Sequence, residues 1–528
     1  MSTKKGETLM RRALGIIVIL MVAVFGWMVV TPAVGQVQRS VTDETLTVAL
    51  GTEPSTLDPQ RTSGDGLMVT KHLFNTLVFP DKNLTIRPEL ATRWTVSSDG
   101  LTWRFELRKD VQFHDGTPFN ADAVVFNLRR ALGPGTGPSL TKTWLDIVDI
   151  DSVKALGDST VQIRTTIPFG GFLYNLGHIG GGLMMSPASV QRFGREVGVR
   201  PVGTGPYRFV EWVRGQRIVL ERNDAYWGPK PAYARLVFVP VPEEAARNAM
   251  LETGEAGVAV RVSPLEAGRL AGNANLQIIK ALVARPFAMV FNNTRKPLRD
   301  IRVRRALNHA VDKQELIKAF FLGDAALLDS VLPPGLPGYR STGTYKYDPA
   351  KAKALLADAG VGQGLRLKAY CPRGRFTLDA EVCQAVAGQL AKVGVSVEVR
   401  IFGDYAAFLT TLERETDFDM YFFGFASGSL DPDGALWPTL FSENAGQRWN
   451  FGRYQNIKVD RMILAARGEL DPAKRRQLYA DLQQVLMDEA PWLFLYTGVG
   501  YTGARRQIKD IWVRPDEQIL FYSAYPGR

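Results

Sequence analysis

The chain of 528 residues contains only two cysteines and four histidines. The histidines, at positions 72, 114, 178 and 309, are scattered and form no HExxH pair, so the sequence indicates no zinc site built on imidazoles. It also contains no GxSxG nucleophile elbow and no GxxxxGK[ST] phosphate loop. No repeat of solenoid length is present. The sequence therefore has no motif for a metalloprotease, an α/β-hydrolase, a P-loop nucleotidase or a repeat protein.

Positive charge is in excess, yet it is not concentrated in one segment. The formal net charge is +11, but lysines and arginines occur mostly singly or in pairs. Nucleic-acid-binding proteins usually gather such charge in a stripe or tail, so we expect no nucleic-acid partner. Apolar residues make up 45% and charged residues 22%, which is ordinary globular composition, and the length predicts two or three domains.

The longest apolar run lies near the amino terminus. Four basic residues within the first twelve precede the run Ala13–Val30, which is followed by Pro32 and the small residues Ala33–Gly35. This order predicts a signal peptide, residues 1–35, and export to the periplasm. The run is also long enough to span a bilayer, so retention as an inner-membrane anchor is the alternative.

The two cysteines, Cys371 and Cys383, lie twelve positions apart. Cys371 ends the strand-like run LRLKAYC, and Cys383 falls on a helix predicted to begin near Leu378. An oxidising compartment would let them pair and fix the loop between them. Two buried free thiols are the alternative.

Alternation and turn signals define the early elements. The run LTWRFELRKDVQF places Trp103, Phe105 and Leu107 on one face of a strand. The triplet HDG follows, with His114 and Asp115 at the strand end, where adjacent side chains point apart. A glycine after an aspartate favours a tight reversal, so we interpret the triplet as a turn and not as a catalytic pair.

Three helices are predicted from their capping side chains. Asn120 precedes ADAVVFNLRRAL, and Asp348 and Asp471 each precede a proline at the first helical position. Residues 361–402 have the pattern strand, loop, helix, strand, which predicts a βαβ unit with a parallel pair. Its loop at 372–376 lies at the carboxyl end of a strand, where open α/β sheets bind ligands.

Several blocks of sequence occur together and in order. They are LDPQ (57–60), LFNTLV (73–78), the run from ELATRW to FNLRR (89–130), VGTGPYRFVEWVRGQRIVLERNDAYWG (202–228), FNNTRKPLRDIRVRRALNHAVD (291–312) and YDPAKAKALLADAG (347–360). Together they closely resemble the large extracellular solute-binding proteins of family 5, the peptide, nickel and opine receptors of ABC importers. The resemblance covers essentially the whole chain after the predicted signal peptide.

The resemblance implies an α/β fold, a two-lobed periplasmic-binding-protein clamshell of the class II type with an extra subdomain in the first lobe. Lobe I is expected over 36–282, with the subdomain at about 80–200 and a carboxyl-terminal return over 497–528; lobe II is expected over 283–496. The family has no catalytic site. We therefore expect a monomeric receptor, not an enzyme, without cofactor or metal, that captures a peptide or peptide-like solute by hinge closure and delivers it to a membrane permease.

The resemblance also suggests how a ligand is held. Dipeptide-binding members place an arginine in the strand-to-helix loop for the peptide carboxylate, and Arg373 and Arg375 occupy that loop here. Exposure to water alone is the alternative for both. Those members carry an aspartate for the peptide's amino group shortly before a DPD run, but Gly428 stands at that position, and Asp431 and Asp433 match the DPD run itself. A glycine cannot pair an ammonium group, which leaves an opine, a glutathione-like thiol, a sugar or a metal chelate as the alternative cargo.

Further residues are candidates for the cleft. They are Glu53, Ser55, Phe425, Ser427, Asp431, Arg448 and Trp449. Phe287 and Met289 share a strand face and are interpreted as core packing. A secreted hydrolase, prompted only by the HDG triplet, is a third hypothesis.

Overall fold

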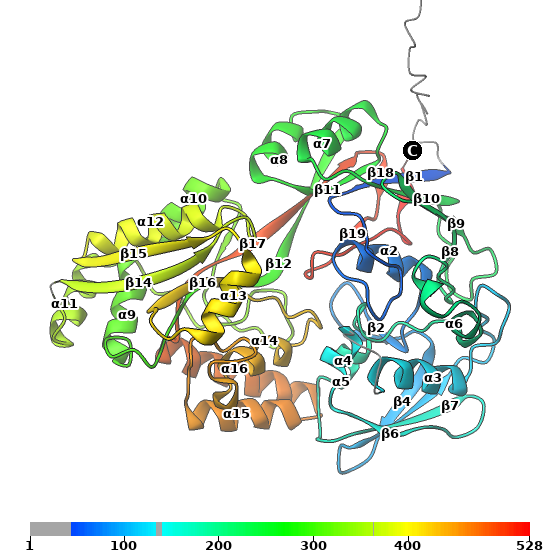
Figure 1. The fold of residues 1–528 in the computed structure, drawn as a ribbon, viewed down its shortest axis with the longest axis horizontal. Coiled ribbons are helices and arrows are strands. Elements are labelled where there is room, and N and C mark those ends of the chain that lie inside the picture. The colour runs from blue at the N-terminus through cyan, green and yellow to red at the C-terminus, as the bar shows by residue number, and fades with distance from the viewer. Residues whose placement is uncertain (1–43, 134–139, 363, 528) are drawn as a thin grey trace, which may run out of the picture. The chain divides into compact units, whose positions relative to one another are not determined.

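The computed structural model describes residues 44–133, 140–362 and 364–527, and within these ranges its largest element is a mixed sheet of eleven strands (Figure 1). In spatial order its strands are β15 (Val395–Phe402), β14 (Leu365–Pro372), β16 (Met420–Gly424), β12 (Leu276–Phe291), β17 (Trp492–Arg505), β11 (Val258–Val262), β1 (Thr45–Leu50), β10 (Arg235–Pro240), β9 (Arg217–Arg222) and β8 (Tyr207–Val213), with β13 (Ala326–Leu327) also beside β17. The predicted signal peptide, residues 1–35, lies outside the described residues. No helix within the described ranges combines the length and apolar character needed to cross a membrane.

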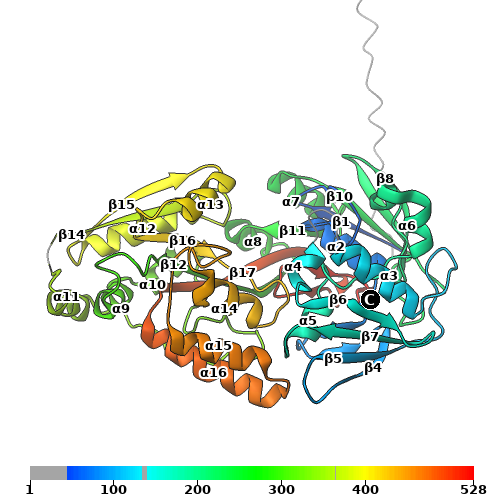
Figure 2. The same cartoon turned by 60° about the horizontal axis from the view of Figure 1, so that its bottom comes forward.

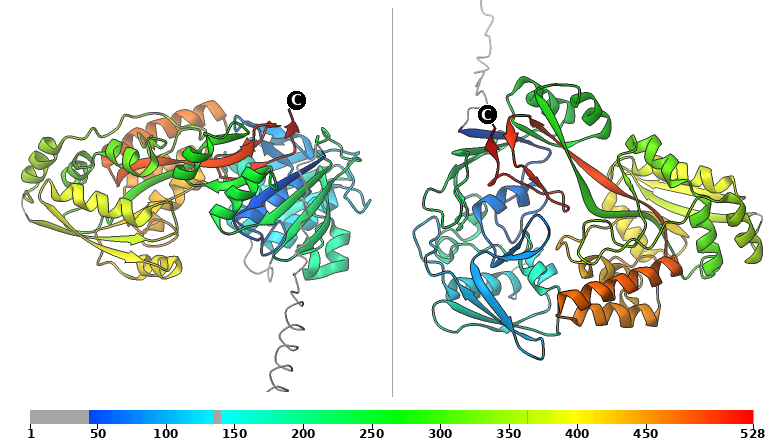
Figure 3. Two further views of the ribbon diagram at one scale, coloured as in Figure 1. Left: turned by 90° about the horizontal axis from the view of Figure 1, so that it is seen from above. Right: turned by 180° about the vertical axis from the view of Figure 1, so that it is seen from behind.

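Two long strands in the middle of this sheet connect its two halves. β12 and β17 pair antiparallel along most of their length, and Figures 1 and 3 show them as one long ribbon. At one end β16, β14 and β15 continue the sheet, here called the β14 half; at the other, β11, β1, β10, β9 and β8 form the β1 half. The pairing of β12 with β17 shifts register between Leu282 and Pro286, where the proline has no N–H to donate. The ribbon is thus irregular between the two halves.

The β14 half is buried on both faces of its sheet. Alternate side chains of β12 point to opposite faces, so Phe287 and Met289 join one apolar cluster while Ala288 and Val290 join the other. The helices of this half are α9 (Ile301–Ala310), α10 (Lys313–Phe321), α11 (Pro349–Asp358), α12 (Asp379–Ala391), α13 (Tyr405–Arg414), α14 (Asp433–Leu440), α15 (Ile457–Gly468) and α16 (Pro472–Glu489). β14 and β15 are parallel neighbours joined through α12, as the βαβ prediction required, and α15 lies beside α16 (Figure 2).

A separate four-stranded sheet, called the small sheet, is formed by residues that lie between β1 and β8 along the chain. Its order is β4 (Ala91–Val96), β5 (Thr102–Leu107), β7 (Thr160–Thr165) and β6 (Val148–Ala155). Trp103, Phe105 and Leu107 of β5 are buried together in one apolar cluster, as the alternation predicted.

The remaining described elements pack around these two sheets. The helices are α2 (Asp65–Leu73), α3 (Ala121–Leu132), α4 (Leu140–Trp144), α5 (Phe172–Leu176), α6 (Pro187–Phe193), α7 (Glu244–Thr253) and α8 (Pro264–Leu270). Short strand pairs are β2 (Val78–Pro80) with β3 (Ile86–Pro88), β18 (Ile508–Lys509) with β21 (Tyr525–Pro526), and β19 (Trp512–Val513) with β20 (Ile519–Leu520). The β19–β20 pair, here called the carboxyl-terminal hairpin, returns to the ribbon, because the Ala284 N–H of β12 donates to the Pro515 carbonyl at 2.8 Å.

Candidate functional site

The loop after β16 carries several of the predicted site residues. β16 ends at Gly424, and the loop continues until α14 begins at Asp433. Ser427 is buried, and its hydroxyl donates to the Asp431 carbonyl at 2.5 Å. This bond closes a turn within the loop, so Ser427 shapes the loop and its hydroxyl is not exposed.

Two carboxylates, one in this loop and one at the first position of α14, face arginines inside the protein. Asp431 accepts two hydrogen bonds from Arg475 of α16, at 2.6 and 2.8 Å, and its side chain is fully buried. Asp433 lies 3.5 Å from the Arg467 guanidinium of α15; burial raises the pKa of Asp433 to about 6, and the charge of Arg467 opposes that rise. A carboxylate removed from water needs such a partner. This placement argues against the predicted role of Asp431 in solute binding and makes it a structural residue.

Gly428 is the point at which this loop approaches the small-sheet region. A Cβ added to Gly428 would lie 2.6 Å from Cζ2 of Trp144, at the end of α4, and 3.3 Å from Nε2 of His178. The Trp144 and His178 rings are themselves 4.7 Å apart, and burial lowers the pKa of His178 to about 4. The close approach of the indole requires glycine at position 428. Sequence reasoning identified neither Trp144 nor His178, because both lie far from the loop along the chain.

An aromatic wall stands beside the same loop. Phe425 and Trp449, both predicted, come together with Phe423: each phenylalanine ring is 5.6 Å from the Trp449 ring, measured between centroids. With Trp492 they line a hollow of about 10 Å³, which is room for about one water molecule. An apolar wall with a few polar groups nearby is the usual composition of a small-molecule site.

Two arginines converge on the loop between β14 and α12. The Arg375 guanidinium lies over the Phe376 ring, 4.8 Å from its centroid, and 5.3 Å from that of Tyr405. Arg285 of β12 lies over the same Phe376 ring at 5.6 Å, and donates to the Gly424 carbonyl at 3.1 Å and to Glu517 of the carboxyl-terminal hairpin at 3.0 Å. A guanidinium stacked on a ring can still donate its N–H groups to a carboxylate, as Arg285 does to Glu517. Sequence reasoning missed Arg285, although a charged residue within the apolar run VARPFAMVF was a signal for it.

Arg373 and Arg448, the other two predicted arginines, are exposed, as Arg375 itself is. Arg373 is held only through its backbone, whose N–H donates to the Phe402 carbonyl at the end of β15 at 2.9 Å. Arg448 lies over the Trp437 ring of α14 at 4.9 Å. Arg373 therefore belongs to the loop that carries Arg375, whereas Arg448 lies next to the aromatic wall through its neighbour Trp449.

Glu53 and Ser55 lie in the β1 half. The Glu53 carboxylate accepts from the Trp212 Nε1–H at 2.9 Å and from the Gly215 N–H at 3.0 Å. The Ser55 carbonyl accepts from Arg214 at 3.2 Å. These bonds tie the segment after β1 to the turn between β8 and β9, which gives both residues a structural role and does not bring them to the residues of the β14 half.

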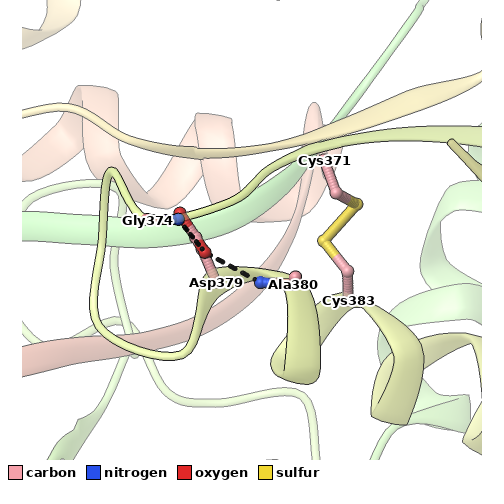
Figure 4. The surroundings of a disulfide bond; sticks show 5 residues. All are labelled: Cys371, Gly374, Asp379, Ala380 and Cys383. Carbon is pink, nitrogen blue, oxygen red and sulfur yellow. Dashed lines mark hydrogen bonds between the residues drawn. A yellow bond between two sulfur atoms is a disulfide. The ribbon is translucent and has the colours of Figure 1, made fainter. Parts of the chain in front are cut away.

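The structure pairs Cys371 with Cys383 in a disulfide, the first of the two alternatives that the sequence left open (Figure 4). The bond joins the end of β14 to the second turn of α12, and both cysteines are buried. It therefore closes the base of the loop that bears Arg373 and Arg375.

The HDG triplet forms the predicted turn. The Gly116 N–H donates to the Phe113 carbonyl at 2.8 Å, and Gly116 has a φ of 83°. His114 Nε2 donates to the Gly205 carbonyl at 3.0 Å, while Asp115 accepts from the Ser186 hydroxyl at 2.6 Å. The imidazole and the carboxylate thus bind different groups. The hydrolase hypothesis needs a hydrogen bond between His114 and Asp115, and each of these side chains instead bonds another residue.

Comparison with known proteins agrees with this architecture. A family model described as bacterial extracellular solute-binding proteins, family 5, middle region, matches residues 85–447. The chain belongs to this family. It is similar to the glutathione-binding protein GsiB of Escherichia coli O1:K1 / APEC, with 32% identity over 484 aligned residues. The alignment covers 90% of this chain and 93% of GsiB.

Solved structures show the same fold. The periplasmic binding protein DppA from Helicobacter pylori, in complex with the peptide STSA, is 27% identical with a TM-score of 0.74, covering 92% of this chain and 98% of that one. HbpA2 from Haemophilus parasuis is 24% identical with a TM-score of 0.85, covering 92% and 100%. The predicted two-lobed α/β fold of a periplasmic binding protein is therefore confirmed.

Membership of family 5 makes the chain a solute-binding component of an ABC importer. The relatives named above are binding proteins and not enzymes. Within the described ranges, no group of three His, Cys, Asp or Glu side chains is placed to hold a metal ion. In this chain the loop after β16 approaches Trp144 at Gly428, and Arg285 beside Phe376 contacts Glu517 of the carboxyl-terminal hairpin.

Proposed function

We propose that the protein captures a small peptide or peptide-like solute with at least one free carboxylate and hands it unchanged to a membrane permease. The observation that carries the proposal is the convergence of Arg285 and Arg375 on the Phe376 ring, at the carboxyl end of β14. A guanidinium from strand β12 and one from the loop after β14 can bind one carboxylate together through hydrogen bonds. The aromatic wall of Phe425 and Trp449 supports an apolar contact for the rest of the solute.

A solute without a conventional free amino terminus is the second candidate. Gly428 offers no carboxylate, and Asp431 is committed to Arg475, so this loop lacks an exposed acid for an α-ammonium group. Glutathione fits that description because the α-amino group of its γ-glutamyl residue is not at the usual peptide position. The 32% identity to GsiB supports testing it first. Opines, sugars and metal chelates are the wider alternatives.

The proposal includes the setting in which the protein works. The pattern of residues 1–35 supports export. The layout of the family supports two lobes, over 36–282 and 283–496, with a return to the first lobe over 497–528. We take the protein to act as a monomer, without nucleic acid, cofactor or catalytic turnover. Amino-terminal sequencing of the mature protein distinguishes a cleaved signal peptide, with a start near Gln36, from a retained anchor.

Identification of the bound solute tests the proposal directly. The purified protein is denatured, and released small molecules are identified by mass spectrometry. Thermal unfolding is then followed with di- and tripeptides, reduced and oxidised glutathione, and an opine, because a ligand of the folded state raises the melting temperature. A bound compound that carries no carboxylate, or one recovered chemically altered, would overturn the proposal.

A matched pair of variants tests the arginine cluster. Arg375→Gln removes an exposed guanidinium beside Phe376, in the loop after β14, whereas Arg366→Gln removes an exposed guanidinium at the other end of β14. Isothermal titration should show about tenfold weaker binding, or about 1.4 kcal/mol, for Arg375→Gln alone. Equal affinities of both variants and the wild type would remove the carboxylate role from this loop.

A further inference from the structure

The loop between β14 and α12, residues 373–378 and called the binding loop below, has an unusual backbone. Gly374 has a φ of 81°, and Leu378, which is not a glycine, has a φ of 55°. Left-handed backbone is disfavoured for leucine, so the surrounding contacts must hold it. Arg373, Arg375 and Phe376 all lie on this loop, and the position of the Arg375 guanidinium depends on the loop's conformation.

One buried carboxylate, that of Asp379, organises the loop. Its Oδ1 accepts from the Gly374 N–H at 3.0 Å and from the Ala380 N–H at 2.9 Å (Figure 4). Its Oδ2 accepts from the Arg375 and Phe376 N–H groups, both at 3.0 Å. Asp379 is 1% exposed, so these four donors replace the water that a carboxylate would otherwise bind. Three successive amides of the loop therefore point at one side chain.

The disulfide constrains the same segment from its base. Cys371 lies next to the end of β14 and Cys383 lies on α12, so the bond encloses the whole binding loop and Asp379 (Figure 4). Both sulfurs belong to the buried core of the β14 half. The covalent bond fixes where strand and helix stand, and the Asp379 carboxylate fixes the path of the chain between them.

We propose that Asp379 and the Cys371–Cys383 disulfide hold the binding loop in its solute-binding conformation before solute arrives. Asp379 is a positioning residue: it acts through Arg375 and Phe376 and does not itself touch the solute. This inference rests on the proposed function of the loop. A loop ordered in advance loses less freedom on binding, and therefore binds more tightly.

The first experiment compares two aspartates that both begin helices. Asp379→Asn keeps the size of the side chain but replaces one acceptor oxygen with an NH₂ group. The two backbone N–H groups that now donate to that oxygen would lose their acceptor. Asp348→Asn is the control, because Asp348 caps α11 through the Lys351 N–H at 2.9 Å, outside the binding loop. The mature protein is titrated with reduced glutathione and with trialanine, and amide hydrogen exchange is measured without either probe.

We expect Asp379→Asn to bind the better probe about tenfold more weakly and to exchange faster at the amides of Gly374, Arg375 and Phe376. Asp348→Asn should keep wild-type affinity and wild-type exchange at those amides. Wild-type affinity in Asp379→Asn despite faster exchange would overturn the proposal, and so would unchanged exchange. If the wild type binds neither probe, the choice of solute in the proposed function fails, and exchange at the three amides alone decides the inference.

A second variant keeps the test informative if Asp379→Asn does not fold. Cys371→Ala with Cys383→Ala removes the covalent bond from a buried apolar site without adding a polar group. We expect weaker binding of the same probe and faster exchange within the binding loop, with β15 and α13 unchanged. A double variant that matches the wild type in both measurements would overturn the role of the disulfide.

Discussion

The buried ion pair of Asp431 with Arg475 holds the loop after β16 against α16. Asp431→Ala would leave the Arg475 guanidinium charged and without its partner in the protein interior. We expect the free energy of unfolding to fall by about 3–5 kcal/mol, measured by urea denaturation. Glu106→Ala is the matched control, because its partner Arg93 is 73% exposed and an ion pair in water contributes little to stability.

A double variant separates a structural role of Asp431 from a role in binding. Asp431→Leu with Arg475→Met replaces both charges with apolar side chains of similar size, and such replacements are often neutral or stabilising. The double variant should recover most of the lost stability and keep its affinity for solute. Recovered stability with abolished binding would return Asp431 to the site.

Buried histidines make the stability depend on pH. Burial lowers the pKa of His114 to about 4, and its Nδ1 accepts from the Gly203 N–H, a bond that protonation would break. His72 and His178 have pKa values of about 4 for the same reason. Because these values lie below that of the unfolded chain, about 6.5, the unfolded chain takes up protons first as the pH falls. Their contribution is complete above pH 6.5 and is lost toward pH 4.

Denaturation at pH 7 and pH 5 measures this effect. We expect each buried histidine to lower the free energy of unfolding by about 2 kcal/mol at pH 5, a drop that His114→Gln should reduce. Asp433 works in the opposite direction below pH 6, because its raised pKa lets the folded protein hold a proton that the unfolded chain releases. A pH dependence unchanged by His114→Gln would show that the protonated ring is accommodated.

At the scale of elements, local signals gave reliable predictions. Asn120 and Asp348 cap α3 and α11 as the sequence indicated, each accepting from the N–H three residues later. The β14–α12–β15 unit and its loop were likewise predictable, because hydrophobic alternation and caps are encoded within a few residues. The order of the strands in the sheet could not be predicted. β16 lies between β14 and β12, and its own sequence carries no signal that identifies these neighbours.

The residues of the candidate site likewise fall into those that local sequence signals indicate and those that depend on contacts between distant segments. Arg375 and Phe425 could be proposed from the sequence because they lie in loops that follow strands, a position with a general link to binding, whereas Trp449 lies in the segment between α14 and α15. Trp144 and Arg285 were not found, because their roles arise from contacts with segments distant in sequence. Gly428 was noticed only as a missing carboxylate; the structure adds the steric reason, an indole too close to admit a Cβ.

The strand β12 brings Arg285 to the loop that bears Arg375. Arg285→Gln removes the charge beside Phe376 while keeping a side-chain donor for the Gly424 carbonyl. We expect about tenfold weaker binding of a carboxylate-bearing solute, or about 1.4 kcal/mol, by isothermal titration. Glu517→Gln removes the exposed partner of Arg285 but not the guanidinium, and should keep wild-type affinity. Equal losses in both variants would assign Arg285 to the hairpin contact alone.

At the scale of the whole molecule, the proposed function requires the two lobes to separate to admit solute, and we take two features of the structure as the candidate places for that motion. The β12–β17 ribbon is irregular between Leu282 and Pro286, where the register shifts and a backbone donor is missing. Hinges are commonly a few residues that absorb a change of backbone angles, and we take this break between the two halves of the ribbon as the candidate. The hollow beside Trp449 has a volume of about 10 Å³, too small for a peptide, while Gly428 touches Trp144. On the proposed function, we therefore expect solute to enter when the contact at Gly428 is open.

A wedge at that contact tests the motion. Gly428→Trp places an indole where even a Cβ would lie 2.6 Å from Trp144, so the lobes cannot close fully. In small-angle scattering, saturating solute should reduce the radius of gyration of the wild type but not of this variant, whose affinity should fall at least tenfold, or about 1.4 kcal/mol. Gly268→Trp is the control, because it lies exposed on α8 and an added Cβ meets no atom within 4 Å. If solute compacts Gly428→Trp as fully as the wild type, closure does not require the loop after β16 to meet the small-sheet region. The solute would then bind at a place other than this contact.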